Sequence, residues 1–145
     1  SFTWSLGIIM ASSINQTTIL WSSASTISLS TNSRYNSDTV TLNVEDWDGS
    51  LQVTADNSGT PASGDVVDVY VKWTNDGTLF DTDEHAEFVC RLDTFPTNTP
   101  GEDPVTRTYS LDVSGKKGFK VSAVAAQGAT RAITFSATLV THRPQ

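Results

Sequence analysis

Hydrophobic and polar residues alternate along most of the chain from Ile19 onward. In the segment 67–73, Val67, Val69, Val71 and Trp73 occupy every second position, and mostly polar residues stand between them. A period of two is that of a β-strand with one buried face and one exposed face. We therefore predict that these four side chains point into a core.

The same period recurs along the rest of the chain, and no longer window has a convincing helical period. The further apolar positions in this phase are Ile27 and Leu29; Val40, Leu42 and Val44; Leu51, Val53 and Ala55; Ala86, Phe88, Cys90 and Leu92; Tyr109, Leu111 and Val113; Phe119, Val121 and Ala123; and Ile133, Phe135, Ala137 and Leu139. We expect each group to lie on the inner face of its strand.

Short polar clusters rich in Gly, Pro, Asn and Asp separate these segments. They occupy residues 46–50, 56–65, 75–78, 96–104, 114–118 and 126–131. Strands at such spacing, with turn residues between them, are typical of all-β sandwiches and barrels. The sequence thus predicts a single-domain antiparallel β-sandwich, jelly-roll or Ig-like, of about seven or eight strands.

The first 18 residues differ from the rest, because an apolar stretch is followed by a polar run. Two readings stay open: this segment is the first strand of the sandwich, or it is an arm that packs on another protein. The sandwich domain would then span 19–145. The candidate interface residues of such an arm are Phe2, Trp4, Leu6, Ile8, Ile9 and Met10. The segment lacks a basic leader, so we do not expect a signal peptide.

The net charge and the length of the chain exclude several classes of function. A chain of 145 residues can bury a real core. Its net charge of −7 argues against binding nucleic acid, which requires a basic face, and against docking on anionic membranes. No apolar run is long enough for a membrane span. The single cysteine, Cys90, excludes an internal disulfide.

Residues suited to catalysis are few, and we expect no enzymatic activity. Only His85 and His142 are available as imidazole bases, and no G-x-S-x-G motif accompanies them. Cys90 is in phase with apolar neighbours, which is typical of a small buried hydrophobe rather than a nucleophile. No cofactor is implied.

An acidic cluster, Asp81, Asp83, Glu84 and Glu87, is the one candidate for a cation site. Calcium prefers several such oxygen ligands, but the spacing does not match the EF-hand loop. We expect these acids to be solvated and predict no metal.

Aromatic residues raise the question of sugar binding, because rings stack on exposed aromatic side chains. Trp73 continues the inward series and is expected in the core, whereas Trp47 lies between two aspartates in a turn and is expected to be exposed. One exposed tryptophan keeps a glycan-binding module open as an alternative.

Three stretches resemble small structural proteins of tailed bacteriophages. They are "SDTVTLNVEDWDGSLQVTADNSGTPASGDVVDVYVKWTNDG", "FDTDEHAEFVCRLDT" and "GKKGFKVSAVAAQGATRAITFSATLVTHR", and together they cover roughly residues 37–143. The resemblance rests on an "SDT" strand start, a "DNSGTPASGD"-like turn, a "DTxxH" loop and a "GxKxxAVxxxxxRAITxSA" ending in this order.

The resemblance implies a virion component with a β-sandwich fold, made in the host bacterial cytoplasm, and it supplies no catalytic residues. The favoured place is the outer capsid surface, as a decoration or cement protein bound to the major capsid protein. A tail or fibre component is the alternative. Because oligomers match local capsid symmetry, we expect a homotrimer.

Overall fold

The computed structural model describes residues 12–95, 103–127 and 132–144. The elements are β1 (Ser12–Thr18), β2 (Ile27–Leu29), β3 (Arg34–Asn36), β4 (Val40–Thr41), β5 (Asp48–Asn57), β6 (Val66–Thr74), the 3-10 helix η1 (Asp83–His85), β7 (Glu87–Asp93), β8 (Val105–Leu111), β9 (Gly118–Ala126) and β10 (Ile133–Pro144). Within the described residues no helix is long and apolar enough to cross a lipid bilayer.

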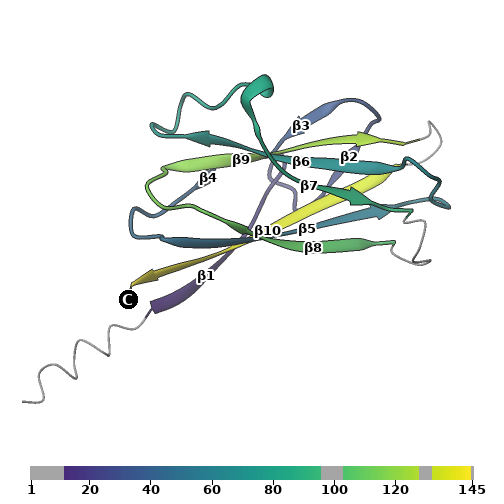
Figure 1. The fold of residues 1–145 in the computed structure, drawn as a ribbon. Coiled ribbons are helices and arrows are strands. Elements are labelled where there is room, and N and C mark those ends of the chain that lie inside the picture. The colour runs from purple at the N-terminus through teal and green to yellow at the C-terminus, as the bar shows by residue number, and fades with distance from the viewer. Residues whose placement is uncertain (1–11, 96–102, 128–131, 145) are drawn as a thin grey trace, which may run out of the picture.

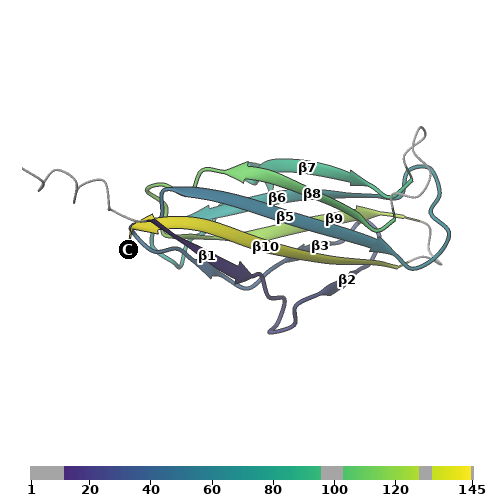
Figure 2. The same ribbon diagram turned by 90° about the horizontal axis from the view of Figure 1, so that it is seen from below.

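The strands form two antiparallel sheets packed face to face (Figures 1 and 2). Sheet I has the order β1-β10-β5-β8, with β2 also paired to β10. Sheet II has the order β3-β9-β6-β7, with β4 also paired to β9. The predicted antiparallel β-sandwich is confirmed. The described strands number ten, because three short strands of two or three residues add to the seven longer ones.

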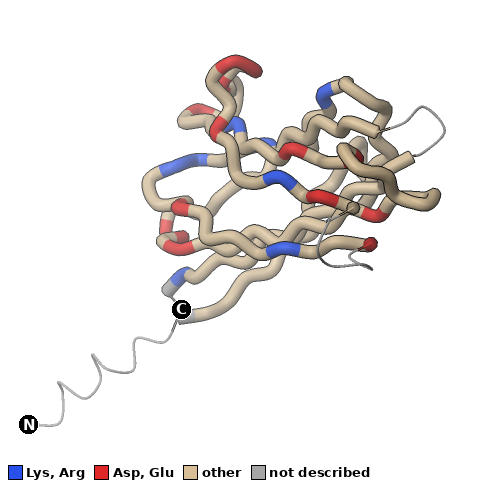
Figure 3. The backbone as a smooth tube through the Cα atoms, turned by 45° about the vertical axis from the view of Figure 1, so that its right-hand side comes forward, with Lys and Arg blue, Asp and Glu red and all other residues tan. Residues whose placement is uncertain are grey.

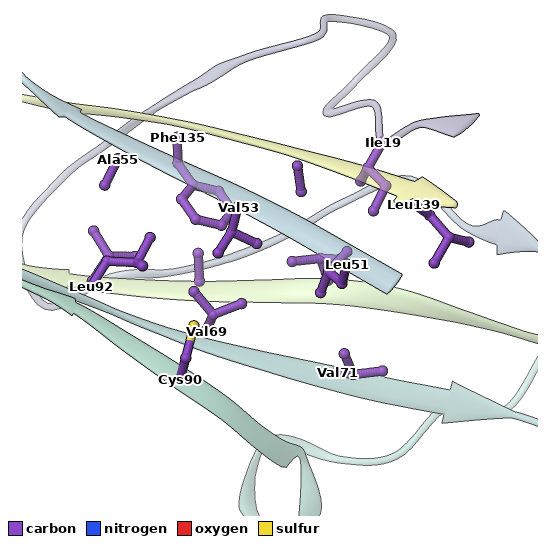
Figure 4. Close-up of a cluster of buried hydrophobic side chains, with 14 of the residues drawn as sticks. Ile19, Leu51, Val53, Ala55, Val69, Val71, Cys90, Leu92, Phe135 and Leu139 are labelled. Carbon is purple, nitrogen blue, oxygen red and sulfur yellow. The ribbon is translucent and has the colours of Figure 1, made fainter. Parts of the chain in front are cut away.

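The core lies between the sheets, where the alternation predicted it. Leu51, Val53 and Ala55 on β5 have no exposed surface, and the same holds for Ile133 and Phe135 on β10. Figure 4 shows side chains from both sheets meeting in this layer, with the Cys90 sulfur among them. Burial of these apolar surfaces is the main force that holds the two sheets together.

Strand β10 joins the two ends of the chain. Its residues Thr138 to Pro144 pair with β1, so that Ser13 lies opposite Arg143. Its first residues pair with β2, and its other edge pairs with β5 along ten positions. The residues Ser12–Thr18 are therefore a strand of sheet I. The candidate interface residues at positions 2–10 lie outside the described residues.

The predicted inward position of Val44 is wrong. Val40 and Leu42 are buried as expected, but the Val44 side chain is 95 % exposed. An Asx turn begins at Asn43, whose side-chain oxygen accepts a hydrogen bond from Glu45 N, while Asp46 Oδ2 accepts one from Asn43 N. This local hydrogen bonding ends the strand pattern before Val44 is reached.

The predicted inward position of Phe88 is also wrong. The pairing of β6 with β7 shifts between Val69 and Tyr70, so that Val69 faces Cys90 but Tyr70 faces Phe88. This bulge adds one residue, Val89, to β7 and reverses the phase of the strand beyond it. Phe88 is consequently 57 % exposed on the outer face, whereas Val89 packs against the core.

Trp73 lies at the rim of the core rather than inside it. The side chain is partly buried and its ring lies 5.3 Å from that of Phe119. Its neighbour Lys72, expected to be exposed, is buried at 6 % exposure, because the loop that carries η1 folds over the outer face of sheet II.

A buried polar network closes the opposite end of the sandwich. Asp65 is 2 % exposed, and its carboxylate accepts hydrogen bonds from Asn57 Nδ2 and Ala62 N, each at 3.1 Å. Asn57 Nδ2 also donates to Thr94 Oγ1 at 3.2 Å, and Asn57 N donates to Asp103 Oδ1 at 2.8 Å. The turn 58–64 is thereby attached to residues near the ends of β7 and β8.

Candidate interaction surfaces

The outer face of sheet I is lined by neutral hydroxyl and amide groups. Gln52 Nε2 donates to Thr108 Oγ1 at 3.1 Å, and the hydroxyls of Thr54 and Thr106 lie 2.9 Å apart. These cross-strand pairs come from the polar positions of β5 and β8, which alternate with core residues. The side chains of this face satisfy part of their own hydrogen-bonding capacity.

The outer face of sheet II has a different character, because aromatic side chains stand on it. The rings of Tyr70 and Phe88 meet edge to face at 5.5 Å. The Arg34 guanidinium lies 4.7 Å from the centre of the Tyr70 ring, and its Nη1 donates to Ser122 Oγ at 2.8 Å. Such a cation–π contact holds both side chains in place.

An ion pair borders this aromatic group. Arg91 Nε and Nη2 donate to the two carboxylate oxygens of Asp68 at 2.7 and 2.9 Å. The hydrogen bonds that Arg91 donates to Asp68, followed by the negative charge of Asp68, raise the pKa of Arg91 above its ordinary value. Exposed aromatic and arginine side chains are enriched in protein interfaces. We name the set Arg34, Asp68, Tyr70, Phe88 and Arg91 the aromatic face.

The acidic residues of the predicted cluster do not converge on one site, and those with partners contact different ones. The Asp83 carboxylate pairs with Lys72 Nζ and lies 3.7 Å from Arg34 Nε. The hydrogen bond from Lys72 is the main cause that lowers the pKa of Asp83. Asp81 Oδ2 accepts from Trp73 N at 3.0 Å.

Two further acids of this cluster are also placed apart. Glu87 Oε2 accepts from Trp73 Nε1 at 2.6 Å, and Glu84 is exposed in η1. Figure 3 shows the loop around η1 as an acidic projection. Among the described residues, no three His, Cys, Asp or Glu side chains are grouped so as to hold a metal ion. Asp81 and Asp83 instead attach this loop to sheet II.

The candidate catalytic residues are not brought together. His85 is exposed in η1, and Cys90 is buried in the core. Burial raises the pKa of the Cys90 thiol to about 11, so the thiol is protonated at neutral pH. His142 lies near the end of β10, where its Nδ1 is 3.4 Å from Asp48 Oδ2.

Trp47 is 45 % exposed, as predicted, and its ring stacks on that of His142 at 6.0 Å. The stack is fixed by its neighbours: Arg143 donates to the buried Asp46 carboxylate at 2.8 and 3.3 Å, and Ser114 Oγ donates to Trp47 O at 2.7 Å. This end of the sandwich thus presents a held indole ring beside carboxylates.

Two open hollows lie at the same end, where β6 and β8 finish and β9 begins. The first, of about 430 Å³, is lined by Trp73, Thr74, Asn75, Asp76, Leu79, Phe80 and Asp81. The second, of about 450 Å³, is lined by Leu42, Val44, Asn75, Gly115, Lys116 and Lys117. Lys116, which lines the second hollow, has its Nζ 4.6 Å from the centre of the Trp73 ring, which lines the first.

The aromatic face was missed in the sequence, because strand phase alone placed Phe88 inside. A signal was present: Tyr70 and Arg91 stand at outward positions of adjacent predicted strands. The burial of Lys72 had no such signal, since it depends on a loop folding back over the sheet.

Comparison with known proteins places the fold. No protein-family model matches the chain, and no curated protein matches its sequence. Among solved structures, the VP2 subviral particle of infectious bursal disease virus is similar over 92 % of this chain, with a TM-score of 0.53 and 12 % identity. The Gx strain of the same virus gives a TM-score of 0.51 and 8 % identity over 92 % of the chain. The fold is one that occurs in virus particles.

The chain spans about a third of those viral proteins, 33 % of the first and 38 % of the second. A capsid structure of the Helicobacter pylori bacteriophage KHP30 also matches, with a TM-score of 0.46 and 13 % identity over 93 % of this chain and 95 % of that one. At these identities the similarity is one of fold.

Proposed function

We propose that this chain is a non-enzymatic structural protein of a tailed-phage particle and that it decorates and stabilises the outer capsid surface. The observation that carries the virion part is the similarity of fold to the VP2 subviral particle over 92 % of the chain. The resemblance of residues 37–143 to structural proteins of tailed phages supports the same role. Synthesis in the host bacterial cytoplasm belongs to this proposal.

The aromatic face is the proposed contact with the major capsid protein. It combines the exposed Phe88 ring with the ordered Arg34 and Arg91 guanidinium groups. Side chains that are held before binding lose little conformational entropy on contact. Many copies on a symmetric shell bind jointly, so a modest contact for each copy is sufficient. We further propose a homotrimer at threefold positions of the shell.

The experiment is the addition of purified chain to capsids assembled without it, followed by co-sedimentation and by imaging of the particles. The expected result is saturable binding, with added density on the outside of the shell. Phe88→Lys should weaken binding at least tenfold. Thr134→Lys, on the exposed outer face of sheet I, is the matched control and should bind as the unmodified chain does.

Density at the tail or a fibre, with none on the shell, would replace the decoration role by the tail alternative. Absence of the chain from every part of the particle would overturn the virion role. Equal loss of binding in both lysine variants would contradict the aromatic face as the contact, because the added charge would then be the cause of the loss.

A second candidate function, glycan binding by a virion module, is favoured by Trp47. Its exposed ring stacks on His142, and His142 Nδ1 lies 3.4 Å from Asp48 Oδ2. Sugar rings stack on exposed aromatic side chains of this kind. Titration with glycans should then change tryptophan fluorescence, and Trp47→Ala should abolish the change. No change with host-surface glycans would remove this candidate and leave the decoration role untouched.

A further inference from the structure

Strand β1 is an edge of sheet I. One side of Ser12–Thr18 pairs with β10 along all seven residues, and no described residue pairs with its other side. The backbone groups on that side are therefore available to a further strand. Figures 1 and 2 show β1 lying along β10, away from the stacked centre of the two sheets.

The other described edges carry features that hinder pairing. β7 contains Glu87, Arg91 and Asp93, and it is interrupted by the bulge. β2, β3 and β4 are three, three and two residues long. β8 carries Arg107 and lies beside β7 of the other sheet (Figure 2). Charge, shortness and bulges are the usual means by which edges avoid association.

β1 has none of these features among its described residues. Its sequence, SSINQTT, contains no charged residue and no proline. Ile14 is 68 % exposed on its outer face, and Gln16 and Thr18 are exposed on the same face. The opposite face carries Asn15 and Thr17, whose side chains hydrogen-bond to each other at 3.4 Å.

We propose that β1 pairs antiparallel with β1 of a second copy of this chain, so that sheet I continues from one copy into the next. The occupant is a second copy because the strand is neutral and self-complementary. Two chains of net charge −7 repel each other, and this repulsion is weakest where the contacting surfaces carry no charge. Pairing centred on Asn15 brings all seven residues opposite one another and places the two Ile14 side chains diagonally across the new ladder.

This contact relates two copies by a twofold axis. It is independent of the proposed capsid role, since it is measured on the purified chain alone. It is also compatible with a trimer held by another surface, because twofold and threefold axes occur together on a symmetric shell.

The first test is sedimentation velocity of the full chain over a range of concentrations. The unmodified chain should self-associate, and a lysine on the edge should block this. Ile14→Lys and Gln16→Lys should each weaken association at least tenfold, with partial recovery at high salt because salt screens the repulsion. Ser110→Lys, at an exposed position of the opposite edge strand β8, is the matched control and should associate normally.

A chain that stays monomeric at every concentration would overturn the proposal. The same conclusion would follow if Ser110→Lys weakened association as much as the β1 variants, since total charge would then be the cause. At concentrations where the unmodified chain is monomeric, unchanged melting temperatures for the three variants are expected, because all three positions are exposed.

The second test locates the contact by oxidative cross-linking. Asn15→Cys and Ile14→Cys are compared with Ser110→Cys. The native Cys90 is buried, with a pKa of about 11, and gives no background cross-link. At least one β1 variant should form a covalent dimer, and the β8 control should not. Absence of a cross-link from both β1 variants, or an equal yield from the control, would overturn the assignment to β1.

Discussion

Asp65 is a single buried carboxylate on which the long turn between β5 and β6 depends. It accepts hydrogen bonds from Asn57 Nδ2 and Ala62 N at 2 % exposure. Asp65→Ala leaves buried donors unsatisfied and should lower the free energy of unfolding by about 1–3 kcal/mol. The measurement is urea denaturation, with Asp56→Ala as the control at an exposed position, expected to change stability by no more than about 0.5 kcal/mol. Equal losses in both variants would contradict the assigned role.

The pair of Lys72 and Asp83 predicts a dependence of stability on pH. The pKa of Asp83 is lowered below its ordinary value of 3.8, chiefly by the hydrogen bond from Lys72. The folded state therefore gains from ionised Asp83 at pH above 3.8 and loses this gain as the pH falls further. Asp83→Asn should be less stable than the unmodified chain at neutral pH, because it leaves the buried Lys72 charge unpaired.

The difference in stability between Asp83→Asn and the unmodified chain should narrow in acid, below the ordinary pKa of the carboxyl group. Thermal unfolding from pH 7 to pH 2 measures it. Glu84→Gln, in the same 3-10 helix, serves as the control and should follow the unmodified chain at every pH. A constant gap between Asp83→Asn and the unmodified chain would show that the ionised pair has no part in the effect.

At the scale of the strand, the bulge in β7 places Phe88 outside, whereas Phe135 keeps its inward position on β10. Phe135 is fully buried on β10, and Phe88 is 57 % exposed on β7. Phe135→Asp should prevent folding, because an unpaired buried charge costs several kcal/mol, comparable to the stability of such a domain. Phe88→Asp should fold and lose about 0.5–1.5 kcal/mol through the contact with Tyr70. Soluble expression and circular dichroism of both variants test whether each of them folds.

Alternation was sufficient to predict the long strands, because burial on one face imposes period two wherever a strand is regular. Leu51, Val53 and Ala55 illustrate this. The prediction failed where a local hydrogen bond or an extra residue intervened, as at Val44 beyond the Asx turn and at Phe88 beyond the bulge. Both features depend on backbone geometry that the apolar pattern does not encode.

The candidate surfaces were less predictable, because they depend on contacts between distant segments. Arg34 meets Tyr70 and Ser122 only when β3, β6 and β9 are neighbours in sheet II. The pairing of β1 with β10 joins opposite ends of the chain and has no local signal in either segment. Trp47 was predictable as exposed, since it lies in a turn between aspartates, but its stacking on His142 was not.

For the whole molecule, the described sandwich starts at Ser12, and every described strand lies at or after that residue. Removal of residues 1–11 should therefore leave a folded β-domain with an unchanged circular dichroism spectrum. It should weaken attachment or assembly, because the removed segment carries the apolar candidate residues Phe2, Trp4, Leu6, Ile8, Ile9 and Met10. Co-sedimentation with capsids and size-exclusion chromatography measure both effects.

Unfolding of this truncated chain would mean that the segment is part of the core. A truncated chain that folds, associates and binds capsids as the full chain does would place the contact wholly on the described surfaces, with the aromatic face and the edge of β1 as the next positions to alter.

The central place of β10 in sheet I also sets the order in which the chain matures during translation. The strands of sheet II all lie within residues 34–126, so that sheet has its complete set before β10 is made. Sheet I lacks the strand that joins β1, β2 and β5 until residues 133–144 have been made. The sandwich therefore closes only once β10 has been made, and until then the growing polypeptide leaves part of its core uncovered.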